Sequence, residues 1–217
     1  MAPLVTMVYY VDVLSSWCYI ADRALERIRE KYGAELHVEW RIAQLFGGGP
    51  LPYTGAELAW YYGRTAKATG VQLDAWWHDR EDDTTLHANL AAEAVRALGV
   101  AGDAVRRGLA HAAMIDRKPM GRRDEAVAEA ARLSGLSATQ IAAAMDSREV
   151  RERIAQTTKE FDDLALTQRP SFLFRDTIDD LAVFSGLYTF ESFDAVVGEM
   201  VHAARINRDY GTPPGSD

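Results

Sequence analysis

The sequence has a single cysteine, no surplus of positive charge and no long apolar run. One cysteine excludes an internal disulfide and a Cys-x-x-Cys redox pair or metal knuckle. The formal net charge of −8 argues against a nucleic-acid or anionic-membrane partner. No apolar stretch approaches a membrane span, and the first residues lack the basic segment of a signal peptide. These absences predict a cytoplasmic protein whose partner is a small-molecule substrate.

The first 45 residues carry the pattern of a β-α-β unit. Residues 4–13 are rich in β-branched and aromatic side chains, which is typical of a buried strand. A helix follows Ser15, with apolar residues at i, i+3, i+4 and i+7 from Ala21, and it ends near Gly33. Residues 35–42 alternate as a second strand. The segment Ser15-Ser16-Trp17-Cys18 therefore stands at the first turn from strand to helix.

The rest of the chain predicts a block of helices followed by two strands and a last helix. Residues 45–55 form a Gly/Pro-rich loop, and the pattern from there to about residue 165 is almost wholly helical. A capping-box pattern opens at Ser137, and Ser147 is a second expected N-cap. Strands are predicted at 171–174 and 181–184, with a turn at 176–180 between them, and the last helix buries Phe193 and its neighbours.

This order predicts an α/β, thioredoxin-like fold with a helical insertion after the second strand. We expect a thioredoxin-like domain from residues 1–44 and 151–208, an inserted helical domain at 45–150 and a flexible tail at 209–217. The length of 217 residues and an apolar content of 48% suit one large domain or two interleaved small ones.

The motif at the first turn departs from that of a redox protein in one position. A thioredoxin-type Cys-x-x-Cys places its first thiol at a helix N-terminus, where the helix dipole favours the thiolate. Ser15 holds that position here, and only Cys18 keeps sulfur. A Ser-x-x-Cys segment cannot cycle between a dithiol and an internal disulfide, so ordinary dithiol exchange is not predicted.

Three segments carry a resemblance to a known group. Residues 9–19 (YYVDVLSSWCY) resemble the strand and active-site segment shared by DsbA/FrnE-like proteins, kappa-class glutathione transferases and 2-hydroxychromene-2-carboxylate isomerases. Arg169-Pro170-Ser171-Phe172 is similar to the cis-proline segment of that superfamily, and Val183-Phe184-Ser185-Gly186 resembles the stretch entering its last helix. The resemblance implies a cis Arg169–Pro170 bond beside Ser15.

The resemblance also implies a function. In the transferases and isomerases a serine at the first position activates the thiol of bound glutathione, which makes Ser15 the first candidate catalytic residue. It implies that Trp17, Arg169, Pro170, Ser185 and Gly186 bind glutathione or another low-molecular-weight thiol. The transferases resemble Gly-Ser-Asp where this chain has Ser185-Gly186-Leu187. An acidic contact is therefore missing, and the identity of the thiol stays open.

Each candidate residue also has a structural interpretation. Ser15 and Ser16 are expected to cap the helix. Cys18 is a second candidate catalytic residue, and a buried apolar role is its alternative. Arg169 is expected to bind a carboxylate or to pair with Asp12, with a surface position as the alternative. The aromatic cluster of Trp60, Tyr61, Tyr62, Trp76 and Trp77 predicts either a lid or core packing.

Three functions follow, and no metal is predicted. The first is a thiol-dependent transferase or isomerase acting on a small electrophilic molecule. The alternatives are an oxidoreductase of the DsbA/FrnE kind that has lost its first cysteine, and a non-catalytic binding module. The acidic run at 78–83 lacks the spacing of a metal-ligand set. A homodimer is a further expectation that the sequence does not test.

Overall fold

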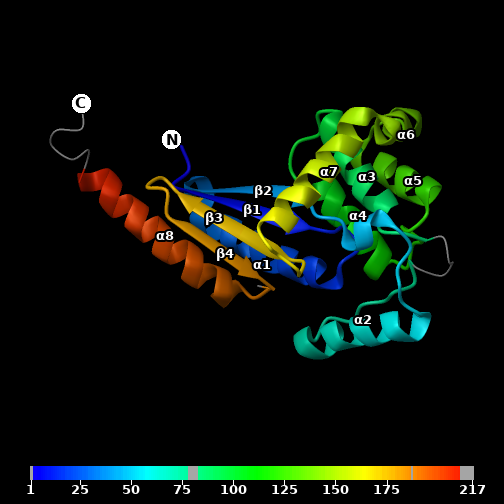
Figure 1. The fold of residues 1–217 in the computed structure, drawn as a ribbon, viewed down its shortest axis with the longest axis horizontal. Helices are drawn as coiled ribbons and strands as arrows, with labels where there is room; N and C mark the ends of the chain where they lie inside the picture. The colour runs from blue at the N-terminus through cyan, green and yellow to red at the C-terminus, as the bar shows by residue number, and fades with distance from the viewer. Residues whose placement is uncertain (1, 78–82, 187, 211–217) are drawn as a thin grey trace.

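The computed structural model describes residues 2–77, 83–186 and 188–210 (Figure 1). The acidic run at 78–82 and the tail from residue 211 lie outside the described residues. In chain order the elements are β1 (Val5–Val11), α1 (Ser16–Tyr32), η1 (Gly33–Glu35), β2 (Leu36–Ile42), η2 (Leu45–Gly48), α2 (Gly55–Thr69), α3 (Leu86–Ala97), α4 (Ala104–Met114), α5 (Arg123–Ser134), α6 (Ala138–Asp146), α7 (Arg148–Asp163), β3 (Ser171–Asp176), β4 (Leu181–Ser185) and α8 (Phe190–Tyr210).

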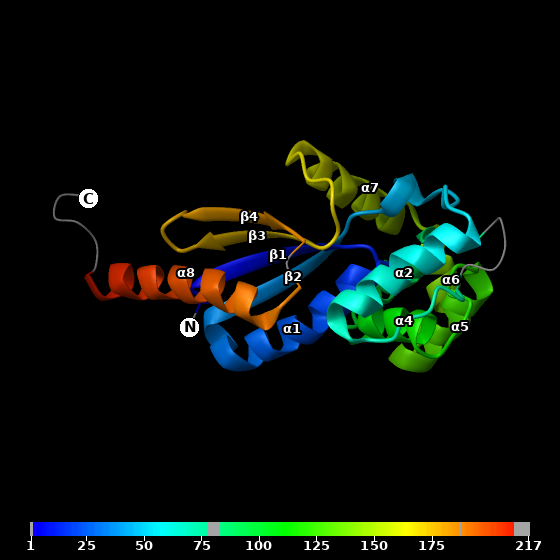
Figure 2. The same ribbon diagram turned by 90° about the horizontal axis from the view of Figure 1, so that it is seen from below.

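The sheet has the strand order β2-β1-β3-β4, with β1 parallel to β2 and antiparallel to β3. Strand β1 pairs on both edges and is almost wholly buried, as its apolar sequence predicts. Tyr9 lies opposite Trp40 on one side and Phe172 on the other. Helices α1 and α8 cover one face of the sheet, and α7 lies over part of the other (Figure 2). The predicted thioredoxin-like fold with helices between its second and third strands is confirmed.

Local sequence signals set several helix starts. Ser15, Ser137 and Ser147 each cap a helix by accepting a hydrogen bond from a backbone N–H three residues on, as predicted. The capping box at Ser137 is complete, because the Gln140 side chain also accepts from the Ser137 backbone. The predicted division into an inserted domain with boundaries at 45 and 150 stays a prediction.

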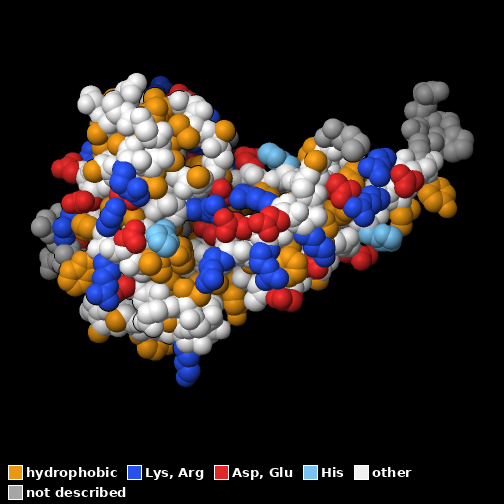
Figure 3. Space-filling model, turned by 180° about the vertical axis from the view of Figure 1, so that it is seen from behind, with side chains coloured by type: hydrophobic (Ala, Val, Ile, Leu, Met, Phe, Trp, Pro, Cys, Tyr) orange, Lys and Arg blue, Asp and Glu red, His pale blue; other side chains and the backbone are white. Residues whose placement is uncertain are grey.

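A buried ion pair joins the helical part to the sheet part. The Arg106 guanidinium in α4 donates to both carboxylate oxygens of Asp22 in α1, at 2.9 and 2.7 Å, and both side chains are buried. Asp103 accepts a further bond from Arg106 at 3.2 Å. Partly exposed pairs, among them Arg107 with Glu26, continue this contact toward the surface. Figure 3 shows acidic and basic side chains interspersed across the middle of this side of the molecule.

No helix among residues 2–77, 83–186 and 188–210 is long and apolar enough to cross a membrane.

The buried pair gives a stability prediction. Asp22→Asn leaves the Arg106 charge buried with only the longer Asp103 contact, and we expect it to lower the free energy of unfolding by about 3–5 kcal/mol. Glu26→Gln removes a carboxylate from an exposed pair on the same helix, so its expected cost is about 0–1 kcal/mol. Urea denaturation followed by circular dichroism measures both. Equal costs for the two variants would contradict a decisive role for the buried pair.

Candidate functional site

The turn between β1 and α1 places Ser15 at the N-cap of a 17-residue helix. Its Oγ accepts a hydrogen bond from the Cys18 backbone N–H at 3.4 Å, and its carbonyl accepts from Tyr19 N–H at 3.1 Å. A hydroxyl accepts with its lone pairs and still carries one proton to donate. The first turn of α1 has no acidic residue, so the positive end of the helix dipole is not neutralised locally. Capping by Ser15 is therefore compatible with hydrogen bonding to an anionic ligand atom.

A pocket of about 160 Å³ opens above this turn. Ser15, Ser16 and Trp17 form one side, and the loop with Gln168 and Arg169 forms another. Most of the remaining wall is apolar and comes from the segment after β2 and from α2. The lining residues from these segments include Leu45, Phe46, Leu51, Tyr53, Leu58, Tyr61, Tyr62 and Arg64.

The aromatic wall of the pocket continues onto the surface. Tyr53 lies 4.8 Å from Tyr61 and 5.4 Å from Phe46, measured between ring centroids. The Arg64 guanidinium lies 5.4–5.8 Å from the centroids of Trp17, Trp60 and Tyr61. Such a cation over aromatic rings is held in place without a carboxylate partner. The mouth of the pocket is therefore aromatic and positively charged.

Asp12 fixes the turn from below. Its buried carboxylate accepts hydrogen bonds from Leu14 N–H, Leu45 N–H and the Asn89 side-chain amide at 3.0, 3.0 and 2.7 Å. Asn89 in turn accepts from Val13 N–H at 2.9 Å. Burial raises the pKa of Asp12, and the donated hydrogen bonds act in the opposite direction. The three segments around Ser15 are thus held by one carboxylate.

Helix α2 holds the same turn from above. The buried Tyr62 hydroxyl donates to the Leu14 carbonyl at 2.9 Å and accepts from the Trp77 indole N–H at 2.7 Å. Thr65 and Ser16 share a hydrogen bond between their hydroxyls at 3.0 Å. Tyr62 and Trp77 are buried, so core packing is confirmed for part of the aromatic cluster, whereas Trp60 is 60% exposed and does not line the pocket. The role of the cluster as a lid stays a prediction.

The Arg169–Pro170 peptide bond is cis, which confirms the prediction. The Pro170 carbonyl accepts from Gly186 N–H at 2.8 Å, and the Ser171 and Ser185 hydroxyls share a hydrogen bond at 2.7 Å. Gly186 has φ of +79°, a left-handed conformation that favours glycine. Ser185 and Gly186 thus brace the proline segment, and neither lines the pocket above Ser15.

Arg169 lines the pocket but does not pair with Asp12, so that expectation is wrong. Its side chain donates to the carbonyls of Ala43 and Gln44 at 2.9 and 2.7 Å, and its guanidinium lies 4.1 Å over the Phe161 ring. The physical reason is that the Asp12 carboxylate already has its N–H donors. No carboxylate in the described part of the chain pairs with Arg169, so its charge adds to the positive character of the pocket.

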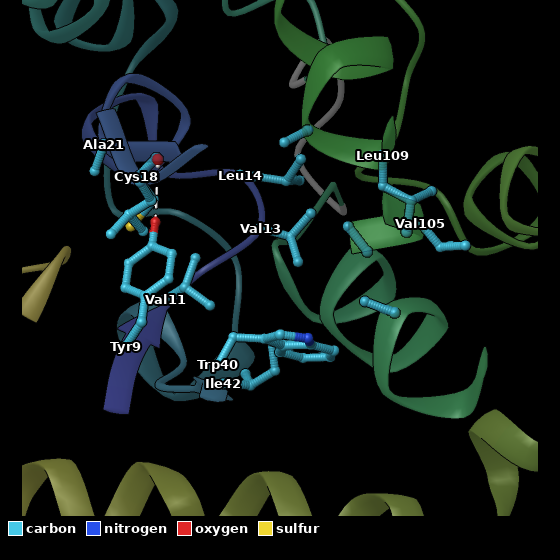
Figure 4. Packing of buried hydrophobic residues seen from close by; sticks show 14 of the residues in the cluster. Tyr9, Val11, Val13, Leu14, Cys18, Ala21, Trp40, Ile42, Val105 and Leu109 are labelled. Atoms are coloured by element: carbon cyan, nitrogen blue, oxygen red, sulfur yellow. Dashed lines mark hydrogen bonds between the residues drawn. The ribbon is translucent and has the colours of Figure 1, made fainter. Parts of the chain in front are cut away.

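Cys18 lies under the turn and is 1% exposed. Burial raises the pKa of its thiol to about 12, while the Ser15 hydroxyl and the Asp12 backbone act weakly in the opposite direction. The Tyr9 hydroxyl donates to the Cys18 carbonyl at 3.0 Å, and Figure 4 shows the Tyr9 ring pointing at it from the core. These are the surroundings of a packed, neutral thiol.

The structure thus brings Ser15, Trp17 and Arg169 to one pocket, with Pro170, Ser185 and Gly186 behind it and Cys18 beneath it. Sequence reasoning considered Asp12 only as a partner of Arg169 and Tyr62 only as part of the aromatic cluster. It gave no supporting role to Thr65 or Asn89. The role of Asp12 could have been predicted from the sequence, because an acidic residue stands at the end of an otherwise apolar strand. No cluster of three or more metal-ligating side chains occurs among the described residues.

Comparison with known families decides the relationship. The profile of the DSBA-like thioredoxin domain matches residues 6–197. The chain belongs to this family. No curated protein matches the sequence closely enough to narrow the relationship further.

Solved structures share the fold at low sequence identity. A putative protein disulfide isomerase from Nitrosomonas europaea is 15% identical, with a TM-score of 0.74 over 92% of this chain and 98% of that one. The cytosolic disulfide reductase DsbM from Pseudomonas aeruginosa is 19% identical, with a TM-score of 0.75 over 91% and 99%, and is also known with GSH. A 2-hydroxychromene-2-carboxylate isomerase is 14% identical, with a TM-score of 0.61 over 95% and 100%. At these identities the likeness shows the fold alone.

The burial of Cys18 gives a direct prediction. At pH 8 we expect iodoacetamide to leave the native thiol unmodified and to label it fully in urea, because a thiol with a pKa of about 12 carries almost no thiolate at that pH. Mass spectrometry of the intact chain measures the label. Labelling of the folded protein at the rate of a free cysteine would show that Cys18 is reactive.

Proposed function

We propose that this chain is a thiol-dependent transferase or isomerase in which Ser15 activates the sulfur of a bound low-molecular-weight thiol. The observation that carries the proposal is the replacement of sulfur by a hydroxyl at the N-cap of α1, in a pocket beside the cis-proline segment. The chain's own thiol, Cys18, is buried one turn further on. A site with the surroundings of a thiolate but no thiol of its own suits a thiol brought by a ligand.

The electrostatics of the pocket suit an anionic sulfur. The Ser15 hydroxyl donates to it, the helix N-terminus stabilises it through its dipole, and the charged side chains of Arg64 and Arg169 line other sides of the same pocket. The aromatic side chains around the pocket, of which Tyr62 and Trp77 are buried, lower the local dielectric and strengthen each of these interactions. Together they lower the pKa of a thiol held there.

The pocket suits one part of glutathione better than another. Its positive groups match the sulfur and a carboxylate, but no aspartate or glutamate among the described residues lines the wall to receive the ammonium group. When bound, a thiol supplies a nucleophilic sulfur that adds to an unsaturated carbon, and it either stays attached or leaves after bond rotation. The apolar wall around Tyr53 and Tyr61 orients the electrophile and excludes water from it.

Ser15→Ala tests the assigned role. We expect this substitution to raise the pKa of the bound thiol by about 1–2 units, because a hydrogen bond to a charged group is worth about 1.5–3 kcal/mol. Thiolate absorbance near 240 nm, recorded against pH with saturating thiol, measures the shift.

Cys18→Ala is the matched control, since it removes the neighbouring side chain and leaves the hydroxyl in place. A large effect from Cys18→Ala and none from Ser15→Ala would overturn the proposal in favour of mixed-disulfide chemistry at Cys18.

The same turn yields a redox prediction. The wild type should reduce insulin with dithiothreitol no faster than Cys18→Ser does, because one thiol cannot close an internal disulfide. Ser15→Cys supplies a second thiol at i+3, so the resulting dithiol can reduce an insulin disulfide to two thiols and be regenerated by dithiothreitol. We expect a clear gain of turbidity-monitored activity in Ser15→Cys alone. Wild-type activity well above the Cys18→Ser background would favour the oxidoreductase alternative.

A further inference from the structure

A second cavity, a groove of about 510 Å³, lies on the far side of Trp17 from the pocket. It runs between α1, the C-terminal end of α2 and the start of α8, which lie together in Figure 2. Its apolar walls include Ile20, Ala24, Val71, Tyr188 and Phe190. The Trp17 and Tyr188 rings, 4.9 Å apart, separate the groove from the pocket at Ser15.

Two arginines on successive turns of α1 give the groove its charge. Arg23 and Arg27 both line it, and neither forms an ion pair with any residue in 2–77, 83–186 or 188–210. Arg27 is held 4.0 Å over the Phe190 ring. Of the two carboxylates in the groove, Glu26 pairs with Arg107, and Glu191 stands in the first turn of α8. Both arginine side chains are exposed, and like charges at i and i+4 repel each other weakly, so a shared anion is favoured.

The anion that fits is a phosphate. One guanidinium binds one carboxylate through two N–H donors. Two neighbouring guanidinium groups instead suit a phosphate or diphosphate group, which carries more acceptor oxygens and up to two negative charges. The groove also receives the N-terminal end of α8, but Glu191 in its first turn offsets the helix dipole there, so the preference for an anion comes from the two arginines.

The groove and the pocket are aligned along one helix. Ser16, Ile20, Arg23 and Arg27 recur at the spacing of one face of α1, and Thr65 and Thr69 of α2 follow beside them. The rise of about 1.5 Å per residue puts Arg27 about 18 Å along the helix from Ser15. Three fully extended residues span only about 10 Å, so a tripeptide with its sulfur at Ser15 does not reach Arg27.

We propose that the groove binds the phosphate of a long-armed thiol, of the phosphopantetheine type, whose sulfur lies at Ser15. This inference rests on the proposed thiol-dependent function. The apolar arm crosses Trp17 and Tyr188, and Arg23 and Arg27 receive the phosphate. These two arginines select between thiols that share the same reactive sulfur.

Isothermal titration calorimetry of the full chain with coenzyme A, pantetheine and glutathione tests the inference. We expect coenzyme A to bind the wild type at least about tenfold more tightly than pantetheine, which has the arm without the phosphate. The Arg23→Gln/Arg27→Gln variant should remove that difference, and Arg148→Gln, an exposed arginine on α7, should keep it.

The outcomes separate the two proposals. Coenzyme A affinity that the double variant leaves unchanged, or binding of glutathione alone, overturns the phosphate site and leaves the thiol-dependent function standing. Binding of no thiol to the wild type overturns both. Inorganic phosphate and adenosine monophosphate serve as further probes, because they carry a phosphate without the thiol arm. If coenzyme A bound through its phosphate and adenosine parts alone, Ser15→Ala would leave the pKa of its thiol unchanged in the thiolate titration, and the placement of its sulfur at Ser15 would be overturned.

Discussion

The buried carboxylate of Asp12 is the interaction on which the candidate site depends. It receives N–H groups from the turn after β1, from the segment after β2 and from α3 of the helical part. No cation pairs with it among the described residues, so all its hydrogen bonds come from neutral donors. Burial raises the pKa of this carboxyl group. The pocket wall at Leu45 and the N-cap at Ser15 are positioned by the same side chain.

The local features of this fold could be predicted from the sequence because their causes are local. Ser15, Ser137 and Ser147 cap helices through hydrogen bonds to backbone N–H groups three residues away. The apolar composition of β1 by itself predicts a buried strand. The cis bond before Pro170 has no local cause in the sequence, and it was predictable only through a resemblance. The thioredoxin-like element order followed from these signals.

The contacts that assemble the site could not be predicted, because their partners are distant along the chain. Arg106 stands in an Arg-Arg pair that reads as solvated surface, yet it is buried against Asp22. Asn89 and Tyr62 reach the turn from helices whose sequences show only amphipathic periodicity. Arg169 does not pair with Asp12 and binds backbone carbonyls instead, since hydrogen-bond competition around Asp12 depends on the assembled fold.

The position of β3 has a consequence for how the chain folds. The central strand β1 pairs with β2 nearby but with β3 only after the helices from α2 to α7, as the pairing of Tyr9 with Phe172 shows. The entropy cost of closing such a long loop comes before the free energy gained from the contact between β1 and β3. Topologies of this kind therefore fold slowly. During synthesis one edge of β1 stays unpaired until most of the chain has left the ribosome, while the helices between β2 and β3 form local contacts first. The site at Ser15 is therefore among the last parts of the molecule to be completed.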